Sequence, residues 1–155
     1  MKGNDKILER LNFLLADELT AVSQYMVHSE MCANWGYSKI ADVIEKRAIN
    51  EMKHAEKLIG RILFLEGAPV VSNLNPMHIG AEIPEQIDND CGAEEGAVYA
   101  YNNAIRLCTQ EGDSGTRELL EDILEDEEEH IDWLENQQVQ IKQMGLPIYL
   151  LAQRD

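Results

Sequence analysis

Four long stretches of the sequence repeat apolar residues at the 3.6-residue period of an amphipathic α-helix. They cover residues 5–34, 38–66, 84–111 and 116–144. Turn-forming and capping residues lie between them: Gly36 is a candidate left-handed C-cap, Ser38 a candidate N-cap, and Pro84 favours the start of a helix. Only 6% of the residues are aromatic, which is low for a β-sheet protein. The pattern therefore predicts an all-α fold.

The lengths of the connections predict how these helices are arranged. Short breaks join the first helix to the second and the third to the fourth, so each pair is expected to form an antiparallel hairpin. The middle connection, residues 67–83, has about 17 residues and can reach about 55 Å, whereas each helix is about 42 Å long. It can therefore run the length of the bundle and leave the second and third helices parallel. A four-helix bundle with one long crossover is the arrangement of ferritin-like folds. Residues 148–152 are expected to add a short C-terminal helix.

The length and charge of the chain limit its organisation and its partners. With 155 residues, positions 1–155 are expected to form a single domain. The formal net charge of −16 favours cations as partners and disfavours nucleic acid and anionic membranes. Cys32, Cys91 and Cys108 are odd in number and form no C-x-x-C pair, so neither a disulfide framework nor a structural zinc site is expected. Without an apolar leader or an 18-residue apolar run, the sequence predicts a soluble cytoplasmic protein.

Each predicted helix carries an acidic residue near the middle of its apolar stripe. Steps of three and four residues along the four stripes arrive at Glu18, Glu51, Glu94 and Glu127. When the hairpins are folded, these positions lie within about two helical turns of the same height. One inward glutamate is unremarkable in a chain with 29 acidic residues, but four at one level indicate a shared role.

Two of these glutamates are followed three residues later by a histidine, in E-M-K-H (51–54) and E-E-E-H (127–130). Residues at i and i+3 leave the same helix face, so both side chains can reach one ion. Four buried carboxylates would repel one another, whereas two divalent cations balance their charge. Mixed oxygen and nitrogen ligands suit iron or manganese, and this ligand pattern is that of di-iron carboxylate bundles. The predicted ligands are Glu18, Glu51, His54, Glu94, Glu127 and His130.

A few other positions have two possible roles. Tyr25 lies two turns beyond Glu18 on the same face, where its hydroxyl can bond a ligand carboxylate of a neighbouring helix or serve as an ordinary core group. His28 is interpreted as a hydrogen-bonded core histidine, and Trp133 as a packing residue. Met52 lies among small residues on a second face of its helix. It is either a packing residue or, at a symmetric dimer interface, one of two equivalent sulfur ligands of a haem.

Along essentially its whole length the sequence resembles the bacterioferritin family. The resemblance rests on M-K-G (1–3), E-L-T-A (18–21) with Q-Y (24–25), N-W-G (34–36), E-M-K-H-A (51–55), R-I-L-F-L-E-G (61–67), the segment 126–133, M-G-L (144–146) and Y-L (149–150). The segment R-I-L-F-L-E-G beside E-M-K-H-A is more specific than the di-iron pattern alone.

The resemblance implies a function in iron storage and detoxification. It implies a hollow homo-oligomeric cage of about 24 subunits, a 24-mer built from two-fold dimers. Ferroxidase activity would oxidise Fe(II) with O₂ or peroxide at a di-iron centre in each subunit, with Glu51 and Glu127 as bridging carboxylates. It also implies haem b shared between two subunits through Met52, and reductive iron release with electrons from a small ferredoxin. Some members carry a His and an Asp that bind iron at the inner cavity surface; this chain has Lys46 and Asn50 there, so that site is not expected.

Two other functions remain compatible with the residues. A di-iron peroxidase or oxygenase can use the same bundle, although the C-x-x-C module typical of rubrerythrins is absent and oxygenase subunits are usually longer. The other compatible function is that of a non-enzymatic haem-bearing or structural bundle whose metal centre is inactive. The amount of iron bound by each assembly would distinguish the three.

Overall fold

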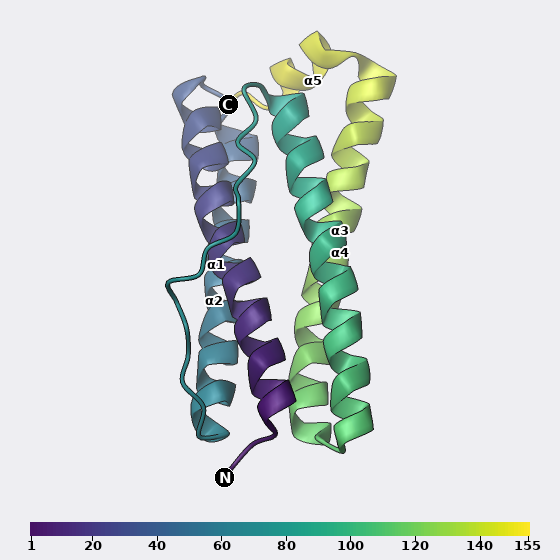
Figure 1. The fold of residues 1–155 in the computed structure, drawn as a ribbon. Coiled ribbons are helices and arrows are strands. Elements are labelled where there is room, and N and C mark those ends of the chain that lie inside the picture. Colours follow the sequence, from purple (N-terminus) through teal and green to yellow (C-terminus); the bar gives the residue numbers. More distant parts are fainter.

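The computed structural model describes residues 1–155 and consists of five helices with no strand (Figure 1). The helices are α1 (Asp5–Asn34), α2 (Ser38–Phe64), α3 (Ile83–Glu111), α4 (Ser114–Met144) and α5 (Leu146–Ala152). This architecture confirms the predicted all-α four-helix bundle with a short C-terminal helix. The last helix begins two residues earlier than predicted, directly after Gly145. No segment of the five helices qualifies as a membrane span.

The ends of α1 and the start of α2 show which of the predicted capping residues cap a helix. The side chain of Asn4 caps α1 by accepting hydrogen bonds from the backbone N–H groups of Lys6 and Ile7. Gly36 has a φ of +87°, as expected for a residue that ends a helix in the left-handed region. The predicted cap of α2 is wrong by one position, because Ser38 is the first helical residue and the N-cap, Tyr37, makes no side-chain capping bond.

Two antiparallel hairpins, α1 with α2 and α3 with α4, form the bundle, and the connection between them spans its length (Figure 1). The chain leaves α2 at one end, returns beside α1, and enters α3 at the opposite end. Helices α2 and α3 therefore run parallel, as predicted from the length of the connection.

Polar side chains of α1 hold this connection along its path. Asn12 accepts a hydrogen bond from the backbone N–H of Val70 at 2.8 Å, and Thr20 accepts one from Asn75 at 2.9 Å. Further along α1, Gln24 accepts from the N–H of His78, and His28 accepts from the N–H of Gly80, both at 3.0 Å. These acceptors satisfy backbone donors that have no partner in a sheet or helix. The connection is thereby fixed against one face of α1.

The apolar core is divided into two clusters by a polar layer. One cluster packs around Ile7, Leu11 and Leu58, and the other around Tyr25, Ile44 and Tyr149. The six predicted ligands lie in neither cluster, although all are buried. The packing on both sides thus holds a charged layer at mid-height inside the bundle.

Candidate metal centre

The structure brings the six sequence-predicted ligands together in two overlapping groups. The first comprises Glu18, Glu51, His54 and Glu127, and the second comprises Glu51, Glu94, Glu127 and His130. Within each group, one ligand atom per residue lies within 4.8 Å of every other. The exposed fractions run from 1% for Glu51 to 6% for His130, so solvent does not screen these charges.

The two groups are related by an approximate two-fold repeat within the chain. The same sequence interval separates Glu18 from Glu94, Glu51 from Glu127, and His54 from His130. Each terminal glutamate thus pairs with one histidine, and the two glutamates common to both groups lie between them. The geometry provides two cation positions with the same types of ligand, and the two shared carboxylates are able to bridge them.

Several inward-facing ligand atoms make no well-aligned hydrogen bond, although some of them lie 2.8 Å from another ligand atom. They are Oε2 of Glu18, Oε1 of Glu51, Nδ1 of His54, and both carboxylate oxygens of Glu127. Buried polar atoms without partners are rare in proteins because their desolvation is uncompensated. A pair of divalent cations would satisfy all five atoms at once, so the residues present fit a two-metal site.

The distances indicate which nitrogen of each histidine faces the cluster. Nδ1 of His54 lies 2.8 Å from Oε1 of Glu127, and Nδ1 of His130 lies 2.8 Å from Oε1 of Glu51. The Nε2 atoms point away from the cluster, toward Asp126 and Asn50. Nδ1 is therefore the nitrogen available to bind a cation.

The crowding of acidic groups alters the pKa values of the ligands. Burial, followed by the charge of Glu18, raises the pKa of Glu51 well above its ordinary value. Burial and the neighbouring Glu94 raise the pKa of Glu127 to about 10. Burial would lower the pKa of His54, but the surrounding carboxylates of Glu127 and Glu18 outweigh it and raise the value to about 10. Without metal, the layer therefore retains protons that reduce the repulsion among its carboxylates.

Two buried tyrosines hold the terminal carboxylates. The hydroxyl of Tyr25 donates to Oε1 of Glu94, and the hydroxyl of Tyr101 donates to Oε1 of Glu18. Tyr25 is on α1 and bonds a carboxylate of α3, whereas Tyr101 is on α3 and bonds a carboxylate of α1. The two hydrogen bonds therefore connect the same pair of helices. The sequence analysis named Tyr25 but missed Tyr101, which the internal repeat could have revealed because Tyr101 follows Tyr25 by the same interval that separates the ligands.

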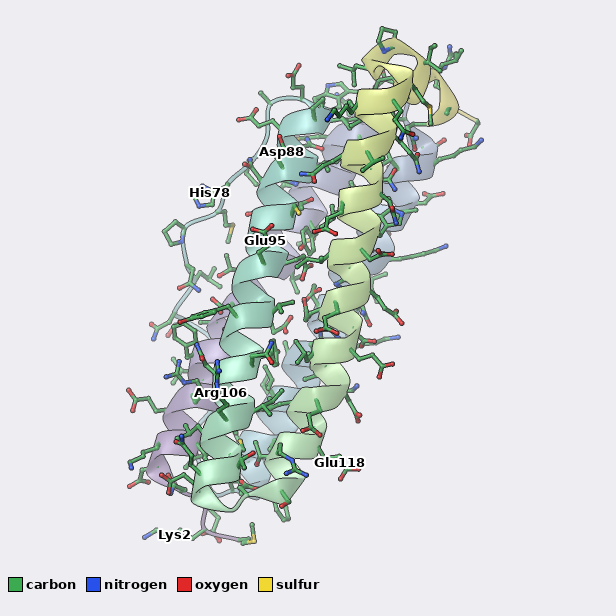
Figure 2. All side chains as sticks on the ribbon, turned by 90° about the vertical axis from the view of Figure 1, so that its right-hand side faces the viewer. Lys2, His78, Asp88, Glu95, Arg106 and Glu118 are labelled. Atoms are coloured by element: carbon green, nitrogen blue, oxygen red, sulfur yellow. The ribbon has the colours of Figure 1, made fainter.

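Two openings lead from the surface to the ligands. A cavity of about 640 Å³ lies between α1, α3 and the connection, and its lining includes Glu18 and Glu94. His78 and Asp88 line its outer part on the same side of the molecule (Figure 2). Burial and the nearby Glu18 raise the pKa of Asp17, another lining residue, to about 6. A second opening of about 570 Å³ lies beside His130.

Met52 and His28 lie apart from the ligand cluster. Met52 is 44% exposed, and Ile49, one turn before it, is 43% exposed, so both face away from the bundle core. His28 is fully buried: its Nδ1 donates to Asp90 at 2.9 Å, while its Nε2 accepts from Gly80. Sequence reasoning did not identify Asp90 as this partner. The three cysteines are free and buried.

The fold and the buried carboxylate–histidine layer define a ferritin-like helical protein, and a family model for the ferritin-like domain matches residues 8–144. The chain is 42% identical to a bacterioferritin of Rhodobacter capsulatus and 41% identical to one of Brucella melitensis, in both cases over 88% of this chain and 85% of the relative. It is 37% identical to bacterioferritin BfrA of Mycobacterium tuberculosis over 96% of this chain and 94% of the relative. The chain belongs to the bacterioferritin family.

Proposed function

We propose that this protein stores iron and oxidises Fe(II) at the buried six-residue cluster. Membership of the bacterioferritin family supports iron storage. The observation that carries the oxidation step is the convergence of five unpartnered ligand atoms in two groups that share Glu51 and Glu127. Two divalent cations would bind these atoms and balance the carboxylate charge, and the oxygen and nitrogen donors suit iron.

In this proposal two Fe(II) ions bind as substrates. Glu18 and His54 hold one, Glu94 and His130 hold the other, and the two shared carboxylates hold both ions close together. Each Fe(II) loses one electron. O₂ takes up the two electrons and two protons to give hydrogen peroxide, or hydrogen peroxide takes up two electrons and two protons to give two waters.

The chain's own residues supply position and charge for this reaction. Tyr25 and Tyr101 restrain the two terminal carboxylates, so that these ligands do not turn toward the helix backbone when a cation leaves. Partners at Nε2 keep both histidine rings oriented with Nδ1 inward. The cavity between α1 and α3 supplies a route for Fe(II), and its acidic lining favours cations.

We further propose that subunits assemble into a cage of about 24 copies that contains the ferric mineral. Met52 would bind a haem b together with the same residue of a second subunit, and the haem would carry electrons from a small ferredoxin for iron release. The exposure of Met52 and Ile49 on α2 supports this, because an apolar face with a sulfur ligand is available to a partner.

The oxidation step is tested by aerobic Fe(II) oxidation with stopped-flow absorbance. The double variant E127A/H130A should oxidise Fe(II) much more slowly than the wild type, while size-exclusion chromatography shows an unchanged assembly. The matched control E128A alters an exposed neighbour on the same helix and should behave as the wild type. Unchanged oxidation by the double variant would reject the proposed centre.

The storage function is tested by the iron content of the assembly after loading. Far more iron than two ions per subunit supports storage, two per subunit indicates an enzyme of another class, and haem alone indicates a carrier. The visible spectrum of the purified protein, compared with that of M52L, tests the haem position separately.

A further inference from the structure

The two histidines of the cluster have chemically different partners on their outer side. Nε2 of His54 lies 2.9 Å from a carboxylate oxygen of Asp126. Nε2 of His130 lies 3.1 Å from the side-chain amide of Asn50. One ring therefore contacts a negative charge, and the other contacts a neutral group.

Asn50 and Asp126 occupy equivalent places in the internal repeat. Each immediately precedes a shared glutamate, and the interval between them equals that between the paired ligands. The terminal glutamates, the shared glutamates, the histidines and the tyrosines are each identical in the two halves. Among the side chains that hydrogen-bond the ligands, the residues behind the histidines are thus the pair that differs in chemistry between the two halves.

This difference affects how well each ring binds a cation. The carboxylate of Asp126 accepts a hydrogen bond only from an Nε2–H group, so once His54 has lost its second proton the lone pair is on Nδ1, where the Asp126 charge strengthens it as a donor. The amide of Asn50 can present either its oxygen or its NH₂ group to His130. With the NH₂ group toward the ring, the proton is on Nδ1, which lies 2.8 Å from Glu51 and 3.3 Å from Glu94. Cation binding at His130 then requires a change of tautomer and a turn of the amide.

The charges around the second opening, beside His130, also weaken cation binding at this histidine. Lys46, Arg47 and Lys53 line this opening beside His130, and Glu129 is the acidic residue among them. The guanidinium of Arg47 lies 5.3 Å from the centre of the Trp133 ring, which holds it at this opening. Three positive groups against one negative group disfavour a cation on the His130 side.

We propose that Asn50 and Asp126 make the two metal positions unequal, so that a divalent cation fills the Glu18–His54 position first and the Glu94–His130 position second. This inference rests on the proposed two-metal centre. Asn50 and Asp126 are positioning residues, since each acts through a histidine ring. Their effect belongs to equilibrium binding and is independent of oxidation.

The experiment is an anaerobic titration of the metal-free assembly with Co(II), followed by calorimetry and by the visible absorption of bound cobalt. The wild type should bind two ions per subunit in separate steps, the first at least tenfold tighter after correction for statistics. N50D should strengthen the second step by about tenfold, and D126N should weaken the first by a similar factor. A crystal soaked with one equivalent of Co(II) should show anomalous scattering at the His54 position.

Two control variants separate the hydrogen bond from general charge. K53Q makes the same change of net charge at the same opening as N50D, and E125Q removes an exposed carboxylate next to Asp126. Both should leave the ratio of the two steps close to that of the wild type. Equal steps in the wild type, first filling at His130, or an effect of N50D no larger than that of K53Q would overturn the inference and leave the proposed centre intact. Absence of Co(II) binding would overturn both.

Discussion

Binding of two divalent cations to the metal-free centre should release protons. The shifts described above leave two ligands protonated at neutral pH, Glu127 and His54, whose pKa values are both raised to about 10. Both must lose that proton to bind a cation. The expected release at pH 7 is therefore about two protons per centre, and the raised pKa of Glu51 acts in the same direction.

The same groups determine the direction of the pH dependence. Apparent affinity for the cation pair should rise with pH, by about a hundredfold per unit while Glu127 and His54 both remain protonated, and should level off near pH 10. The metal-free protein should show the opposite trend. A raised pKa in the folded state stabilises the protein below the unfolded pKa, and this stabilisation is lost as pH rises through the folded value. The stability of the metal-free fold should therefore fall as pH rises, between 4.5 and about 10 through Glu127 and between 6.5 and about 10 through His54.

Calorimetric titration with Co(II) in buffers of different ionisation enthalpy measures the protons released. The exposed-site variant E128Q is the control and should release as many protons as the wild type. Release of fewer than about one proton per centre at pH 7 would show that the carboxylates are already ionised in the metal-free interior. The reasoning from desolvation would then be wrong.

Three further predictions concern residues outside the ligand set. Replacing the N-cap Asp113 with Ala should lower the free energy of unfolding by about 1–2 kcal/mol in urea denaturation. Because hydrogen bonds in the folded state outweigh burial and lower the Asp113 pKa, this deficit should shrink as pH falls below about 3.8. G80A should lower the free energy of unfolding by about 1–3 kcal/mol, since a Cβ at this position would lie 2.4 Å from a backbone nitrogen of α3. G60A places its Cβ in open space within a helix and should raise the free energy of unfolding by about 0.5–1 kcal/mol. Equal melting temperatures of the two variants would contradict this. Y25F and Y101F should each weaken Co(II) binding about tenfold with unchanged circular dichroism, and wild-type affinity in both would show that the hydroxyls do not restrain the ligands.

The helices could be predicted from the sequence because their signals are local. An apolar period of 3.6 residues and a glycine at a helix end act within a few turns, so the predicted and observed boundaries of α1 agree and those of the other long helices differ by no more than two residues. The N-cap of α2 was harder to predict. The helix begins directly after the turn at Gly36, so Ser38 is its first residue although serine is a good capping residue. The long crossover followed from chain length, because too few residues would have forced a different topology.

The sequence alone determined that each helix would bury an ionisable residue, because spacing along a helix sets the face on which Glu18 or Glu94 lies. Only the tertiary structure decided what those residues meet. The hydroxyl of Tyr101 reaches Glu18, and Asn50 reaches His130, because the rotation and height of each helix are set by packing on both sides of the polar layer. Spacing within one helix carries no information about the rotation of its neighbour, so contacts between helices depend on how the whole core closes.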